Sequence, residues 1–221
     1  MRVRTTDTSL APGSFEPFAM VCASDAAFGP VRTLLRFALA ALLSLVPGAP
    51  ALAAEPLPAG VVDQSFTSGA GARVLQLSTD IDAPVSQVWA AFASEDGFRA
   101  WAVPLARIDL RIGGSIESSY DPKVPLGSGK TIRNEIVALV PERLLVLRNV
   151  QAPPGVPFDV GIFQSLQTGM WFEAIDAGRT RLTLVNGPFL DTPAHDGAWR
   201  FFQAGNAYSL AAVRQHLAPR K

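Results

Sequence analysis

One long apolar stripe near the C-terminus constrains the fold of this chain more than any other feature. Between residues 192 and 217, apolar side chains and one asparagine recur at the spacing of a single helix face. They are Trp199, Phe202, Asn206, Leu210, Val213 and Leu217. Pro193 suits the start of a helix and Pro219 suits its end. The sequence therefore predicts a long helix whose apolar face must pack against another element.

The segments before this helix read mostly as short strands. In residues 73–81 apolar and polar side chains alternate, which is typical of a half-buried strand. Two short helices are predicted at residues 85–92 and 94–101, strands dominate residues 105–184, and 151–164 is the longest candidate loop. This order predicts an α+β domain in which a curved antiparallel sheet of about six to seven strands wraps around the C-terminal helix. A cleft between such a sheet and helix is a default ligand site.

The N-terminal residues have the order of a secretory signal. Arg32 and Arg36 precede an apolar run at residues 37–46, and small residues follow at 51–53. We expect residues 1–53 to comprise an N-terminal extension plus a signal peptide that is cleaved at its end. The apolar run is shorter than the roughly 20 residues of a membrane-spanning helix, so we expect no stable span in the mature protein.

The predicted mature protein consists of a leader at residues 54–62 and one domain at residues 63–218. Export would place it in the periplasm or outside the cell. Translation could begin at Met1, Met20 or Val31, and the latest of these starts gives a signal peptide of ordinary length.

Charge and composition point away from several classes of partner. The 221-residue chain has a formal net charge of +0 and no block of like charges, which disfavours nucleic acid as a partner. Its single cysteine, Cys22, precedes the predicted mature protein. The two histidines are too few to indicate a His-rich metal site, and we expect His195 to be solvated at the helix start. We expect neither metal nor cofactor, and the sequence leaves the oligomeric state open.

Residues 127–131, with the sequence GSGKT, look like the end of a phosphate-binding loop. That motif requires a glycine five positions before Gly129, where this chain has Val124. It also requires a helix after the loop, whereas residues 132–140 read as a strand. We therefore predict a hairpin loop that binds no nucleotide.

A set of short motifs occurs in a defined order between residues 63 and 217. They are Ala83-Pro84 and Val88-Trp89 within residues 79–101, Asp109-Leu110-Arg111 with Gly113-Gly114, the turn at 140–144, the strand at 180–184, and Trp199. Their order resembles the START-like helix-grip superfamily called SRPBCC. Within it, the chain resembles the branch named after the C-terminal domain of the Aha-type activator of the ninety-kilodalton heat-shock chaperone, and the run Phe201-Phe202 with Gly205-Asn206 resembles a mostly uncharacterised bacterial subgroup.

This resemblance implies a hydrophobic cavity between the sheet and the final helix. Some members of the superfamily bind lipids, sterols or plant hormones, and others are polyketide cyclases. A cytosolic chaperone is not an expected partner of an exported protein. We therefore expect an exported domain that binds a small hydrophobic or aromatic molecule.

Asn206 is the most informative polar residue, because it shares the apolar stripe and should face the sheet. Its amide could bond to a strand, or it could fix the orientation of a ligand. If its loss leaves no partner unpaired, leucine could replace it at modest cost. The other candidates for lining the cavity could equally fill the core; they are Trp89, Trp101, Phe172, Leu184, Trp199 and Phe202.

Arg133 and Glu135 share one face of a predicted strand, and alternation does not say which face is inside. If they point inward, they could hold a polar head group or act as acid and base. If they point outward, they form a surface pair worth under about 1 kcal/mol. Two other functions therefore stay open. One is a cyclase or hydrolase-like enzyme that uses Arg133, Glu135 and Asn206, and the other is a protein-interaction module with a filled core.

Overall fold

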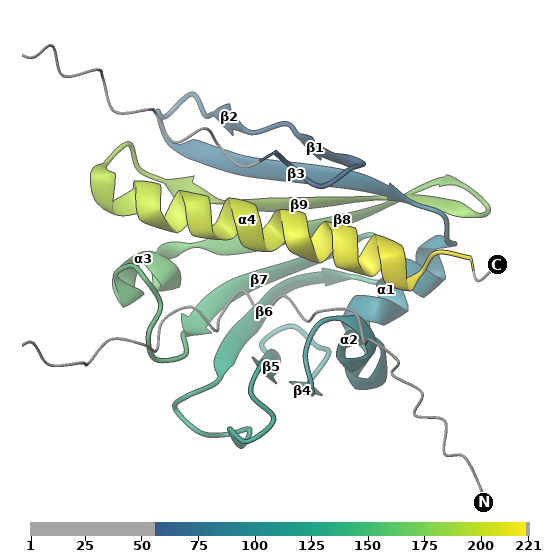
Figure 1. The fold of residues 1–221 in the computed structure, drawn as a ribbon, viewed down its shortest axis with the longest axis horizontal. Coiled ribbons are helices and arrows are strands. Elements are labelled where there is room, and N and C mark those ends of the chain that lie inside the picture. Colours follow the sequence, from purple (N-terminus) through teal and green to yellow (C-terminus); the bar gives the residue numbers. More distant parts are fainter. Residues whose placement is uncertain (1–55, 220–221) are drawn as a thin grey trace, which may run out of the picture. The chain divides into compact units, whose positions relative to one another are not determined.

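The structure is a computed structural model that describes residues 56–219 (Figure 1). The predicted N-terminal extension, the signal peptide and Cys22 lie outside the described residues. None of the helices in the described range is long and apolar enough to cross a membrane.

The described residues form one antiparallel sheet with four helices (Figure 1). The strands are β1 (Val61–Asp63), β2 (Phe66–Thr67), β3 (Arg73–Ile81), β4 (Leu105–Ile108), β5 (Ser115–Ser119), β6 (Ile132–Val140), β7 (Leu144–Gln151), β8 (Gln167–Asp176) and β9 (Arg179–Phe189). The helices are α1 (Val85–Ala93), α2 (Glu95–Trp101), α3 (Val160–Ser165) and α4 (Pro193–His216). The strand order is β1-β3-β9-β8-β7-β6-β5-β4, and β2 pairs with β3.

The predicted α+β fold, with a curved antiparallel sheet and a long C-terminal helix, is confirmed. The nine strands exceed the expected six to seven, because the edge of the sheet carries short pieces such as β1 and β2. The short helix α3 lies in the segment that was predicted to be the longest loop. Asp159 caps this helix by accepting a hydrogen bond from the backbone N–H of Gly161.

Helix α4 begins and packs as its sequence predicts. The hydroxyl of Thr192 accepts a hydrogen bond from the backbone N–H of His195, and Pro193 occupies the first turn. The helix lies across one face of the sheet, closest to β3 and β9 (Figure 1). Its inward residues Leu210 and Val213 are fully buried. We call the sheet face that α4 covers the helix-side face, and the opposite one the outer face.

Strand alternation supplies the core on the helix-side face. Fully buried positions recur on β3, β6, β7 and β9; they include Leu75, Leu77, Ile136, Leu145 and Leu182. Helix α1 closes one end of this core, where the ring of Trp89 meets that of Phe172 edge-on at 5.1 Å. The aromatic rings at that end of the core therefore pack against one another.

Candidate functional site

A row of polar side chains interrupts the apolar helix-side face. Asn134 on β6, Asn149 on β7 and Asn186 on β9 alternate in step with buried apolar residues of the same strands. Strand register makes Asn134 the direct partner of Asn149, and makes Thr168 on β8 the direct partner of Asn186. We call these four residues, together with Asn206 on α4, the amide row.

Asn206 joins α4 to the sheet through this row. Its side-chain N–H donates to the amide oxygen of Asn186, which is fully buried. The Asn186 amide in turn donates to the Thr168 hydroxyl at 2.6 Å. Asn206 thus points at the sheet, as its place on the stripe indicates, and its partner is a side chain of β9.

The other end of the amide row has an unpaired acceptor. The Asn149 amide donates to the carbonyl oxygen of Phe163 at 3.1 Å, which links β7 to α3. The side-chain oxygen of Asn134 is buried and has no hydrogen-bond partner among residues 56–219. A buried acceptor without a donor costs about 1–3 kcal/mol. The Asn134 oxygen is therefore available to a donor from another molecule.

Aromatic rings gather beside the amide row, between α3 and α4. The Phe158 ring lies 5.2 Å from Phe201 and 6.0 Å from Phe202. Phe202 also stacks on Phe163 at 6.1 Å, and Phe189 meets Trp199 edge-on at 5.3 Å. Phe202 and Trp199, both predicted site residues, lie in this cluster and are half-buried. The Phe202 ring, stacked on Phe163, offers an apolar surface beside the amide row, whereas the guanidinium of Arg73 lies 5.2 Å from the centre of the Trp199 ring.

The remaining apolar candidates lie elsewhere. Trp101 contacts Phe92 edge-on at 5.0 Å, and its indole N–H donates to the carbonyl oxygen of Ala91. Phe172 packs on the same Phe92 ring at 5.7 Å. Trp89 and Leu184 are buried within the same core. The structure therefore uses Trp89, Trp101 and Phe172 as packing around α1 and α2.

Arg133 and Glu135 do not belong to the site. They alternate with Asn134 and Ile136, so they lie on the outer face, away from Asn206. Glu135 forms an ion pair with Arg148 of β7, and both side chains are partly exposed. The sequence did not say on which face of the sheet Arg133 and Glu135 lie. Ile136 is fully buried, and the alternation of side chains along β6 therefore places the pair on the outer face.

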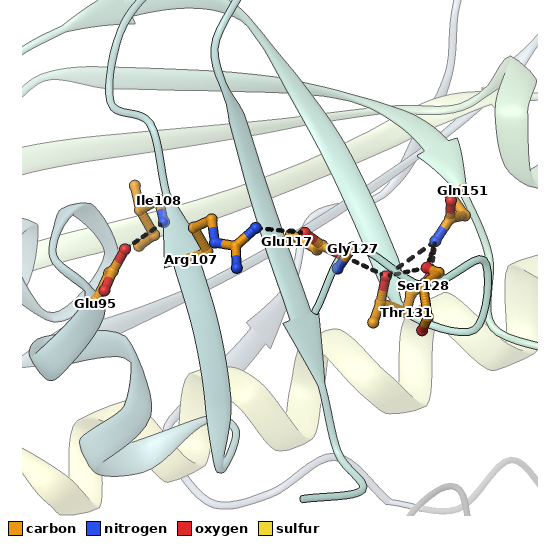
Figure 2. Close-up of polar contacts among 8 residues, drawn as sticks. All are labelled: Glu95, Arg107, Ile108, Glu117, Gly127, Ser128, Thr131 and Gln151. Atoms are coloured by element: carbon orange, nitrogen blue, oxygen red, sulfur yellow. Dashed lines mark hydrogen bonds and ion pairs between the residues drawn. The ribbon is translucent and has the colours of Figure 1, made fainter. Parts of the chain in front are cut away.

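The GSGKT segment is a hairpin loop between β5 and β6, and a strand follows it (Figure 2). The carboxylate of Glu117, buried on the outer face, accepts hydrogen bonds from the Gly127 N–H at 2.6 Å and the Thr131 hydroxyl at 2.7 Å. Arg107 lies 3.9 Å from the other carboxylate oxygen. Gln151 donates to the carbonyl oxygen of Ser128 (Figure 2). A glutamate thus occupies the donors that a phosphate would need.

Sequence reasoning missed several of these residues. Asn149 and Asn186 could have been found by strand parity only if the register between strands were known, and Phe163 only if helix α3 had been predicted. His195 was expected to be solvated, but it is only 9% exposed on the inward side of α4. Its Nδ1 atom has no partner within the described part of the chain.

A curved antiparallel sheet that grips one long C-terminal helix, with polar groups between them, defines a helix-grip domain. The family model "Activator of Hsp90 ATPase homolog 1-like protein" matches residues 82–218, and the chain belongs to this family. No curated protein matches the chain in sequence.

Solved structures show the same fold at low identity. The solution structure of the Aha1 dimer from Colwellia psychrerythraea has a TM-score of 0.50 at 12% identity, over 65% of this chain and 95% of the other. A protein from Mesorhizobium loti has a TM-score of 0.51 at 17% identity, over 66% and 96%. The di-domain ARO/CYC BexL from the BE-7585A biosynthetic pathway has a TM-score of 0.51 at 14% identity, over 65% and 46%. At these identities the likeness concerns the fold alone.

Proposed function

We propose that the domain binds a small, largely apolar and neutral molecule on its helix-side face, with a hydroxyl or N–H of the ligand donating to Asn134. The buried, unpaired oxygen of Asn134 carries this proposal. A donor from the ligand would remove the cost of that unpaired acceptor. The ring of Phe202, which stacks on Phe163 of α3, supplies the apolar contact.

Burial along β6 supports an opening at this position. Ile132 and Asn134 share the helix-side face and are only half-buried, whereas Ile136 further along the strand is fully buried. Helix α4 packs closest on β3 and β9, at the other side of the sheet. The ligand would therefore lie over β6, between α4 and the strand.

The chemistry of this face over β5 to β9 favours a neutral ligand and binding rather than catalysis. Helix-side positions of β5 to β9 carry no Asp, Glu, Lys or Arg. The charged or titratable groups of this face lie on β3 and α4 instead: they are Arg73, which pairs with Asp196, and His195. Acid–base catalysis needs a titratable group within hydrogen-bond reach of the reacting atom. The alternative enzyme counted Arg133 and Glu135 among its polar cavity residues with Asn206, and the first two lie on the outer face.

Matched probes test the proposal on the full-length protein. 2-Naphthol carries a hydroxyl donor, and 2-methoxynaphthalene has the same rings without the donor. In the wild type, 2-naphthol should bind about 2- to 12-fold more tightly, the equivalent of one hydrogen bond of 0.5–1.5 kcal/mol. Fluorescence titration measures both dissociation constants.

The substitution Asn134→Leu should abolish this preference without lowering the melting temperature, because it removes an acceptor that has no partner. Arg133→Leu, one residue away on the outer face, is the control and should keep the preference. An undiminished preference in Asn134→Leu, or no saturable binding of either probe to the wild type, would refute the proposal.

We also propose that the protein is exported to the periplasm or secreted. Support comes from the order of Arg32 and Arg36, the apolar run at 37–46, and the small residues at 51–53. N-terminal sequencing of the cell-envelope and culture-fluid fractions should find a chain that begins at Ala54. Intact cytosolic protein that begins at Met1 would contradict it.

A further inference from the structure

A hollow lies at the β1 edge of the sheet, apart from the amide row. Its volume is about 350 Å³, at the lower end of the range for small-molecule sites. Its lining includes Gly60, Val62, Gln64, Asp80, Arg181 and Arg214. The lining is mostly polar and includes two guanidinium groups, which come from β9 and α4.

Arg214 is held in place by the turn before β1. Gly60 has a φ of +82°, and a Cβ atom added there would lie 2.0 Å from a terminal nitrogen of Arg214. The same guanidinium donates to the carbonyl oxygen of Ala59 at 2.8 Å. Glycine at position 60 therefore allows the guanidinium to lie against the backbone. Within residues 56–219, its other N–H groups form no hydrogen bond.

Arg181 is held by Asp80. Its Nε and one terminal nitrogen donate to the two carboxylate oxygens of Asp80, at 2.8 and 3.1 Å. These hydrogen bonds, with the positive charge of Arg181, hold the pKa of the Asp80 carboxyl below its usual value. Asp80 thus stays ionised at neutral pH. Two guanidinium groups and one carboxylate leave the lining with one net positive charge.

We propose that this hollow binds a small organic monocarboxylate between Arg214 and Arg181. A planar guanidinium matches a carboxylate through parallel hydrogen bonds. One net positive charge suits a monoanion better than a phosphate dianion, which Asp80 would repel. The Gln64 amide oxygen already accepts from the Ser78 hydroxyl at 3.1 Å, which leaves the N–H groups of this amide to donate to the ligand. The exposed side chain of Val62 provides the apolar wall.

NMR titration of the full-length protein with sodium benzoate tests this site. The backbone amide signals of Gly60 and Val62 should shift saturably, and the neutral analogue benzamide should produce no such shift. Arg214→Gln should weaken benzoate binding about tenfold or more, as expected when a charge-assisted hydrogen bond is lost. Gly60→Ala should also weaken it, because the added methyl group displaces the guanidinium.

Two control variants separate this site from its surroundings. Arg179→Gln removes a nearby exposed charge outside the hollow and should change the dissociation constant less than about twofold, since exposed charges are screened. Asn134→Leu should leave benzoate binding unchanged, so failure here and failure of the proposed function are distinguishable. Unsaturable shifts in the wild type, equal affinity in Arg214→Gln, or tighter binding of inorganic phosphate than of benzoate would overturn the assignment.

Discussion

The hydrogen bond between Asn206 and Asn186 makes Asn206→Leu a sharp test of how α4 is attached to the sheet. Leucine is close to asparagine in volume and suits a stripe of apolar residues. However, it removes the N–H that donates to Asn186, and the Asn186 side chain is fully buried. The substitution therefore leaves a buried amide oxygen without a donor. From the sequence alone we expected Asn206→Leu to cost little stability, because the sequence does not show the hydrogen-bond partner of Asn206.

The structure raises the expected cost. An unpaired buried acceptor destabilises by about 1–3 kcal/mol. In a domain of this size, each kcal/mol lowers the melting temperature by about 2–4 °C, so we expect a decrease of about 2–12 °C. Asn186→Leu should destabilise as well, because it unpairs both Asn206 and Thr168. The double variant should lose less stability than the sum of the losses in the two single variants. The difference, the coupling energy, should be about 1 kcal/mol.

Thermal melts followed by circular dichroism measure all three variants under one set of conditions. Gln215→Leu makes the same amide-to-leucine change on the exposed side of α4, and its melting temperature should remain near that of the wild type. If Asn206→Leu melts no lower than Gln215→Leu, or if the double variant is strictly additive, the attachment through the amide row is refuted.

Three further predictions concern the outer face, the hairpin loop and the tyrosines. Glu117→Leu should destabilise by about 1–3 kcal/mol in denaturant unfolding, because it leaves the Gly127 N–H without an acceptor and the Thr131 hydroxyl with only the Ser128 carbonyl to donate to, and Glu117→Gln should cost less; equal effects would contradict this. Calorimetry with magnesium and ATP should give no saturable heat, whereas micromolar binding that is lost in Lys130→Ala would prove the loop a nucleotide site. Burial, followed by the neighbouring Tyr208, raises the pKa of the Tyr120 phenol. The neutral Tyr120 phenol therefore contributes stability that is present below pH about 10 and lost as the pH rises through the folded-state pKa. Tyr208→Phe leaves Tyr120 as the one tyrosine of the chain, and absorbance titration of this variant should show a raised titration midpoint. A midpoint at the ordinary tyrosine value would contradict the prediction.

Helical periodicity was sufficient to predict α4 and the direction of Asn206. A helix stripe identifies its inward face by itself, because only one side of α4 is apolar. Strand alternation gives two faces without saying which is inside. Arg133 and Glu135 were therefore ambiguous, and only the burial of Ile136 places them on the outer face.

The amide row could not be predicted from sequence, because it depends on register. Asn134 and Asn149 meet only because β6 and β7 pair as they do, and this ladder contains two irregularities. Thr168 and Asn186 lie side by side for the same reason. The short helix α3 escaped prediction because it follows a proline-rich stretch and spans only six residues. The aromatic cluster between α3 and α4 could not be predicted either, because it includes Phe163 of α3.

Native mass spectrometry of the protein purified from its own host tests the central claim, binding on the helix-side face, most directly. The wild type should carry a small molecule that is released on denaturation, and the Asn134→Leu variant purified in the same way should carry much less of it. Arg133→Leu should retain the molecule at the wild-type level. If the wild type shows only the mass of the bare chain, or if Asn134→Leu retains the molecule as fully as Arg133→Leu does, the account of this site is wrong.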